Sequence, residues 1–106
     1  MPSVPAVVVL GLLTLTSGVA AQAAPLPKVK EEKAGLLAQA KITPDSAAKL
    51  GSAKYPDAVI QSAEIEEEDG RLIYSFDFKT AGKAGVDEVQ VDAKTGEVVG
   101  TEHEDE

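Results

Sequence analysis

The sequence has no cysteine, no tryptophan and only one histidine among its 106 residues. Without cysteine the chain forms no disulfide, no thiolate metal site, no thiol nucleophile and no lipid-modified cysteine anchor. The one histidine, His103, lies in a run of acidic residues near the carboxyl end. General acid–base catalysis needs a positioned group with a tuned pKa, which an exposed terminal histidine does not supply. We therefore expect no catalytic residue and a protein that is not an enzyme.

Motifs for cofactors and metals are also missing. No glycine-rich phosphate loop is present, and no serine has a histidine base nearby. Carboxylates cluster at Glu64–Asp69 and Glu102–Glu106, and hard cations prefer such oxygen ligands. The first cluster lacks the spacing of a calcium loop, and the second has no scaffold, so both are interpreted as solvated charged edges. We expect no cofactor and no metal, and Glu64, Glu66 and Glu68 are kept as possible interaction residues.

The whole chain carries a net charge of −8, and its basic residues become scarce toward the carboxyl end. Residues 25–56 contain six lysines and three carboxylates, a net charge of +3. Residues 57–106 contain four basic and fifteen acidic groups, a net charge of −11. Binding to a phosphate backbone needs a basic face, so nucleic acid is not expected as a partner. The pattern favours a protein partner with a basic surface, and solubility alone is the simpler alternative.

No charged residue occurs in the first 24 positions. The apolar run from Val4 to Leu15 has the length of a signal-peptide core and is short for a membrane span. Ala21-Gln22-Ala23 resembles a cleavage site. Residues 1–23 are predicted to be a signal peptide, so the protein is expected in the periplasm or outside the cell, without stable membrane insertion after cleavage. No basic residue precedes the core, which leaves open that the segment stays as an anchor.

Two segments have helical patterns. Residues 24–41 are expected to form a linker and partly helical lead-in, with apolar positions of residues 28–40 spaced three and four apart. A better-marked helix follows, in which Thr43 is a good N-cap and Pro44 suits the first helical position. Tyr55-Pro56 ends it. The stripe expected to face a sheet consists of Ala47, Leu50, Gly51 and Lys54.

Alternating apolar and polar residues predict strands over 58–66, 71–79, 86–93 and 97–101. Asp69-Gly70 between the first two is a strong hairpin signal. On the second strand the apolar positions form the expected core face, and Tyr74 is interpreted as a core residue with its hydroxyl in water. Asp92 and Gly96 are given structural roles, Asp92 as an acceptor for turn amides and Gly96 where a positive φ is needed.

These elements predict an α+β domain in which a helix packs on one face of a three- to four-stranded antiparallel meander sheet. The domain is expected to cover residues 42–101. Residues 102–106, with the sequence EHEDE, are expected to form an acidic tail that buries nothing.

Residues 42–99 resemble the PepSY domain, a module of metallopeptidase propeptides and of small exported bacterial proteins. The resemblance rests on Ile42-Thr43 with Ala47, on Ala63–Glu66, on Asp69–Phe76 and above all on Val91–Val98. It implies a single helix on an antiparallel sheet, export, and no catalysis of its own. In propeptides the module accompanies inhibition and folding assistance of the attached protease, and stand-alone copies are suspected of restraining proteases.

The expected function is therefore that of an exported, non-catalytic binding or regulatory module, with an exported peptidase that it inhibits or modulates in trans as the leading partner. Contact through an exposed strand edge and contact through the acidic face of the sheet both remain open at this point. The alternatives are a small-ligand or cation-binding envelope protein that uses Glu64, Glu66, Glu68 and the tail, and a structural interaction module.

Overall fold

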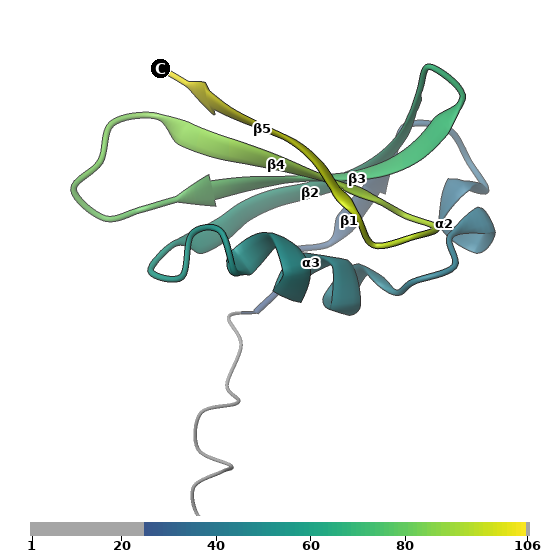
Figure 1. Ribbon diagram of the computed structural model, residues 1–106, viewed down its shortest axis with the longest axis horizontal. Helices are drawn as coiled ribbons and strands as arrows, with labels where there is room; N and C mark the ends of the chain where they lie inside the picture. The colour runs from purple at the N-terminus through teal and green to yellow at the C-terminus, as the bar shows by residue number, and fades with distance from the viewer. Residues whose placement is uncertain (1–24, 106) are drawn as a thin grey trace, which may run out of the picture.

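The computed structural model describes residues 25–105, so the predicted signal peptide at residues 1–23 lies outside the described residues. They form a five-stranded sheet in the order β1-β2-β3-β4-β5, with the helices on one face (Figure 1). The elements are β1 (Val29–Glu31), α2 (Leu36–Gln39), α3 (Pro44–Ser52), β2 (Val59–Glu68), β3 (Arg71–Lys79), β4 (Val86–Asp92) and β5 (Val98–Glu104). Within this described part, no helix has the length and apolar character needed to cross a membrane.

The α+β class is confirmed, and the strand count is corrected to five. Strands β2 to β5 pair antiparallel, as expected for a meander. Strand β1 adds a parallel pairing, in which Val29–Glu31 lie beside Ala63–Ile65 of β2. Within the lead-in, whose residues 28–40 have a helical pattern, only the four residues of α2 are helical, and Val29–Glu31 form a strand. Gly35, with φ 91°, turns the chain between β1 and α2.

Two carboxylates fasten this lead-in to the domain. The Glu31 carboxylate accepts a hydrogen bond from the backbone N–H of Leu37 at 2.8 Å, at the start of α2. The Glu32 carboxylate accepts one from the backbone N–H of Glu67 at 3.0 Å, on β2. Lys33 adds an ion pair to Glu67 at 2.9 Å. Charged side chains of the lead-in therefore attach it to the backbone and to the sheet.

Helix α3 begins as predicted, because the Thr43 hydroxyl accepts a hydrogen bond from the backbone N–H of Ser46 at 3.1 Å. Its buried face differs from the expected stripe. Ala47, Ala48 and Gly51 are buried, whereas Leu50 is 44% exposed. At Gly51 an added Cβ would lie 3.3 Å from the Phe78 ring. Small residues thus bring the helix backbone close to β3.

The core lies between α3 and the sheet, on the face predicted from the alternation in β3. Tyr74, Phe76 and Phe78 are fully buried there. The rings of Phe76 and Phe78 meet edge to face, with centroids 6.4 Å apart. The Tyr74 hydroxyl, expected in water, instead donates a hydrogen bond to the Ile42 carbonyl at 2.8 Å. It therefore ties β3 to the residue that precedes the N-cap of α3.

A register shift near the start of β2 interrupts the alternation of faces along this strand. The shift lies between Ile60 and Ser62, and Val59, which strict alternation would place on the face of Ala63, is 56% exposed. The hairpin turn that follows β2 is as predicted. Asp69 and Gly70 both have positive φ, 51° and 78°, which a two-residue hairpin of this type requires.

The predicted acidic tail is corrected, because Glu102 to Glu104 extend β5. His103 pairs with Asp87 of β4, and its Nδ1 lies 2.8 Å from an oxygen of that carboxylate. Lys83 contacts the other oxygen at 2.9 Å. These side-chain hydrogen bonds, first from Lys83 and then from His103, lower the pKa of Asp87, which is itself buried. This side-chain contact holds the end of β5, whereas Val98 at its start packs against the core.

Candidate functional site

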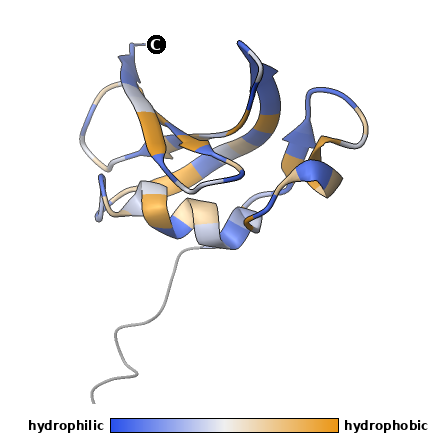
Figure 2. Ribbon diagram, turned by 45° about the vertical axis from the view of Figure 1, so that its right-hand side comes forward, coloured by the Kyte–Doolittle hydropathy of each residue, from blue (hydrophilic) through white to orange (hydrophobic). Residues whose placement is uncertain are grey.

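The sheet has one covered and one uncovered face. Both helices lie on the core side, and in Figure 2 the β2–β3 hairpin and β5 rise away from them on opposite sides. Side chains of a strand alternate between faces, so the neighbours of the core residues point to the uncovered side. This open face is formed by Ser62, Glu64, Glu66 and Glu68 of β2, Arg71, Ile73, Ser75, Asp77 and Lys79 of β3, Glu88, Gln90 and Asp92 of β4, and Glu102 and Glu104 of β5.

The structure places the three predicted interaction residues, Glu64, Glu66 and Glu68, together on the open face. They occupy alternate positions of β2, which is why their side chains share one side of the sheet. Burial, the charge of Glu64 and a hydrogen bond with Glu68 raise the pKa of Glu66 to about 7. Such a shift is expected where carboxylates crowd together and partly lose contact with water.

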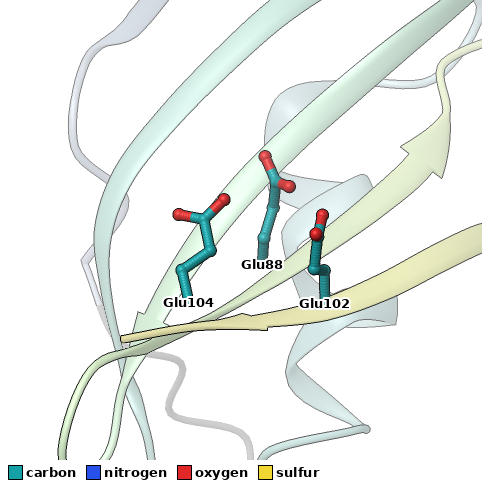
Figure 3. A group of neighbouring side chains, drawn as sticks. All are labelled: Glu88, Glu102 and Glu104. Atoms are coloured by element: carbon teal, nitrogen blue, oxygen red, sulfur yellow. The ribbon is translucent and has the colours of Figure 1, made fainter. Parts of the chain in front are cut away.

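A second group of carboxylates consists of Glu88, Glu102 and Glu104, in which two residues of the predicted acidic tail meet a residue of β4 that was not predicted. Oxygens of the three side chains lie within 4.8 Å of one another (Figure 3). Glu88 is opposite Glu102 in the β4–β5 register, and the Ser75 hydroxyl donates to Glu88 at 3.2 Å. The pKa of Glu88 is raised, mainly by burial and further by the carboxylates around it, although the Ser75 hydrogen bond lowers it. Exposed acidic groups are common without a bound ion, so this cluster by itself does not identify a metal site.

Alternation along each strand was the signal that could have found these residues. Glu88 lies between the core residue Val89 and the buried Asp87, and Glu102 lies two positions from Glu104. The sequence pattern did not show that β5 continues past Thr101. Without that continuation, Glu102 and Glu104 could not be placed on a sheet.

The basic groups of β3 on the open face are engaged within the fold. Arg71 lies 3.5 Å from an oxygen of Asp92, measured from its Nε. The Lys79 ammonium donates to the carbonyls of Lys83 at 2.7 Å and Gly85 at 2.9 Å. Among residues 25–105, no lysine or arginine forms an ion pair with Glu64, Glu66, Glu68, Glu88, Glu102 or Glu104. The two groups of carboxylates are therefore not neutralised by side chains of the described residues.

A hollow of about 360 Å³ opens at one end of this face. Its lining consists of Glu68, Asp69, Arg71, Ile73, Gln90 and Val99. Ile73 is buried and Val99 half-buried, so apolar side chains contribute to the hollow beside acidic ones. The hollow joins the β2–β3 turn to β5 across the width of the sheet.

The predicted motif residues Tyr74, Asp92 and Gly96 lie in structural positions. The Asp92 carboxylate accepts hydrogen bonds from the backbone N–H groups of Lys94 at 2.8 Å and Thr95 at 3.0 Å. Burial acts to raise the pKa of Asp92, but these hydrogen bonds and the Arg71 charge lower it on balance. Gly96 has φ 85°, and its N–H donates to the Asp92 carbonyl at 2.9 Å. These contacts close the turn between β4 and β5.

One helix packed across a mostly antiparallel sheet, with the second face uncovered, defines the protein as a small α+β module. Comparison with family models gives its family. The model of the peptidase propeptide and YPEB domain, PepSY, matches residues 41–102. This match spans more than half of the chain, and the protein belongs to the PepSY family, as the motifs at residues 42–99 predicted. No curated protein and no solved structure matches the chain.

Proposed function

We propose that the protein is an exported, non-catalytic binding module that modulates a peptidase in trans. The observation that carries this proposal is the match to the peptidase propeptide and YPEB family over residues 41–102. Export is supported by the uncharged apolar run and the Ala21-Gln22-Ala23 site of the sequence. A propeptide-like module acts by binding, and an uncovered sheet face offers surface for it.

The use of the one histidine supports a non-catalytic role. His103 contacts Asp87 through Nδ1 and lies 3.2 Å from a carboxylate oxygen of Asp105 through Nε2. Both ring nitrogens are thus within reach of carboxylates, one on β4 and one on the residue that follows β5. A general base needs a nitrogen directed at a substrate proton, and here the imidazole instead fastens β5 to β4.

Titration of the purified protein into the secreted peptidases of its source organism tests the proposal. Peptide hydrolysis should fall with added protein and saturate near a stoichiometric ratio. An unrelated acidic protein of similar size and net charge is the control, since it reproduces the charge but not the fold. Unchanged hydrolysis at a large excess of protein would contradict the proposal for those peptidases.

The same preparation separates this function from cation binding, the alternative suggested by the carboxylates. A cation-binding protein would give a saturable heat signal when titrated with calcium, which takes oxygen ligands, or with zinc, which also binds Asp and Glu oxygens. Binding heat together with unchanged peptide hydrolysis would favour the alternative. Inhibition without binding heat would favour the peptidase partner.

A further inference from the structure

We propose that the open face of the sheet is the surface that binds the partner, and that it takes an extended, lysine- and arginine-rich segment of that partner. The inference rests on the proposed function, because that function implies a protein partner. The inference adds which surface of this protein binds the partner and what kind of segment the partner presents. Three features of the described residues carry it: the accessibility of the face, its uncompensated charge and the shape of its hollow.

The first feature is that the face is accessible. The helices pack on the opposite side of the sheet, which Figure 2 shows as the lower side of the molecule. Glu68, Glu102 and Glu104 are exposed, and Glu64 and Glu66 are half-buried. A partner can therefore reach all five carboxylates without displacing any helix or strand.

The second feature is charge complementarity. The six carboxylates of the two groups and Asp77 share this face, and Lys30, which is in register with Glu64, is the nearest basic residue on β1. The lysines of the opposite side, such as Lys49 and Lys54, are exposed on or next to α3. The helix side therefore carries exposed lysines beside the carboxylates Asp45 and Asp57, whereas carboxylates outnumber basic groups on the open face. A cationic segment is attracted more strongly to the open face, which favours one orientation and speeds its encounter.

The carboxylates of the open face repel one another. A cationic segment would relieve this repulsion, and that relief would favour binding. Oxygens of Glu88, Glu102 and Glu104 lie within 4.8 Å of one another, and the pKa values of Glu66 and Glu88 are raised chiefly by burial and further by the carboxylates around them. An arriving ammonium or guanidinium group would stabilise their ionised forms. Nucleic acid and anionic lipid would increase the repulsion, as would the same face of a second copy.

The third feature is the hollow of about 360 Å³ between the β2–β3 turn and β5. Long basic side chains place their aliphatic stems on apolar surface and their charged ends near acids. Val99, which is half-buried, supplies apolar surface here above the buried Ile73, and Glu68 and Asp69 supply the acids. Arg71, which also lines the hollow, is paired with Asp92. The hollow therefore suits the stem and head of one basic residue of the segment.

A labelled peptide of alternating lysine and serine is the probe for this surface, because an extended strand would place all its lysines on one side. Fluorescence anisotropy at low ionic strength should show binding that weakens as salt is added. The same peptide with glutamate in place of lysine is the control, and it should not bind. Equal binding of both peptides, or of neither, would overturn the proposal.

Two triple variants with the same change in net charge separate the face from the charge of the whole molecule. Glu88→Gln/Glu102→Gln/Glu104→Gln removes carboxylates from the face, and it should weaken lysine-peptide binding about tenfold, since exposed ion pairs contribute modestly each. Asp45→Asn/Asp57→Asn/Glu97→Gln removes exposed carboxylates from elsewhere in the domain, and it should change binding by less than about twofold. Equal weakening by both variants would overturn the proposal.

Amide chemical shifts of the unsubstituted protein give a test that does not depend on the variants folding. The lysine peptide should shift amides of β2, β4 and β5 near the carboxylates, and shifts confined to α3 would overturn the proposal. The peptidase assay separates this inference from the proposed function. If the face variant inhibits peptidases as well as the unsubstituted protein does, the face is not the binding surface and the proposed function stands. If the peptide binds the face but peptidases are unaffected, the proposed function fails and the surface stands.

Discussion

The side chain of Asp92 stabilises the turn between β4 and β5, which the sequence already predicts. Its carboxylate accepts two backbone hydrogen bonds, from Lys94 and Thr95, and is 7% exposed. Asp92→Ala leaves both N–H groups without their partner, so we expect the free energy of unfolding to fall by about 2 kcal/mol. Asp92→Asn keeps an acceptor oxygen in place and should cost about half as much. Urea unfolding followed by circular dichroism measures both.

The Asn variant is also the control for the charge of this residue. Because the folded protein lowers the pKa of Asp92, its ionised form stabilises the fold above the ordinary aspartate pKa. That contribution is lost as the pH falls through the folded pKa. The Asn variant should lack this acid-sensitive part. If Asn and Ala were equally destabilising at neutral pH, the charge pair with Arg71 would matter more than the turn hydrogen bonds.

At the scale of elements, the lead-in β1 and α2 lie outside the family match yet belong to the packed domain. Leu36 of α2 is 2% exposed and is part of the core, whereas Leu50 of α3 is 44% exposed. Leu36→Ala should lower the free energy of unfolding by about 3 kcal/mol, because it removes a buried side chain and leaves a cavity. Leu50→Ala, the matched control, should cost less than about 1 kcal/mol.

Both leucine variants are measured by the same urea titration. Equal effects of the two substitutions would mean that the lead-in does not pack on the core in solution. A large effect of Leu36→Ala alone would place the boundary of the folding unit before residue 36, ahead of the family match at residues 41–102.

The elements that could be predicted from the sequence are those with local signals. Helix α3 begins at an N-cap and a proline, and β3 alternates over nine residues, so each is specified by its own neighbours. Strand β1 has only three residues, and its partner Ala63–Ile65 is more than thirty positions away. From the sequence alone, the charged residues of the lead-in are as compatible with a solvated helix as with a strand. Only the structure shows that Glu31 and Glu32 accept backbone hydrogen bonds.

In the candidate site, too, the residues specified by local pattern could be predicted and those brought together by strand pairing could not. Glu64, Glu66 and Glu68 share a face because they lie on one strand, and alternation alone predicts this. Glu88 and Glu102 meet only through the register of β4 with β5, which shifts between Gln90 and Val91. The Asp87–His103 contact belongs to the same pairing, and no short-range pattern indicates it. A cluster whose side chains come from two different strands therefore could not be predicted from the sequence, and only the structure shows it.

The charge of the whole molecule is distributed unevenly. Lysines are concentrated before residue 57 and carboxylates after it, and the fold gathers six of those carboxylates on the open face while Lys41, Lys49 and Lys54 lie on or near α3. Surface charges of one sign repel and destabilise the compact state while they increase solubility. The acidic face is thus expected to cost stability whenever its carboxylates are ionised.

This cost should appear as a dependence of stability on pH. The ordinary pKa of a glutamate is 4.5, and the folded protein raises that of Glu66 to about 7, chiefly through burial and the charge of Glu64. Between these values the folded state binds more protons than the unfolded state, so stability decreases as the pH rises. The raised pKa of Glu88 acts in the same direction. After allowance for solvent exposure, we expect the free energy of unfolding to be on the order of 1 kcal/mol lower at about pH 8 than at about pH 5.

Glu66→Gln tests the assignment to this residue, because glutamine keeps the shape of the side chain and carries no charge at any pH. Urea unfolding of the variant should show a smaller loss of stability between about pH 5 and pH 8, and the variant should be more stable than the unsubstituted protein at the higher pH. Added salt should reduce the difference between the two proteins, since screening weakens repulsion between exposed groups. Asp57→Asn, which removes an exposed carboxylate outside the open face, should leave the pH dependence unchanged. If the unsubstituted protein were instead more stable at about pH 8 than at about pH 5, the carboxylates of the open face would not be under mutual repulsion, and the driving force inferred for binding a cationic segment would be absent.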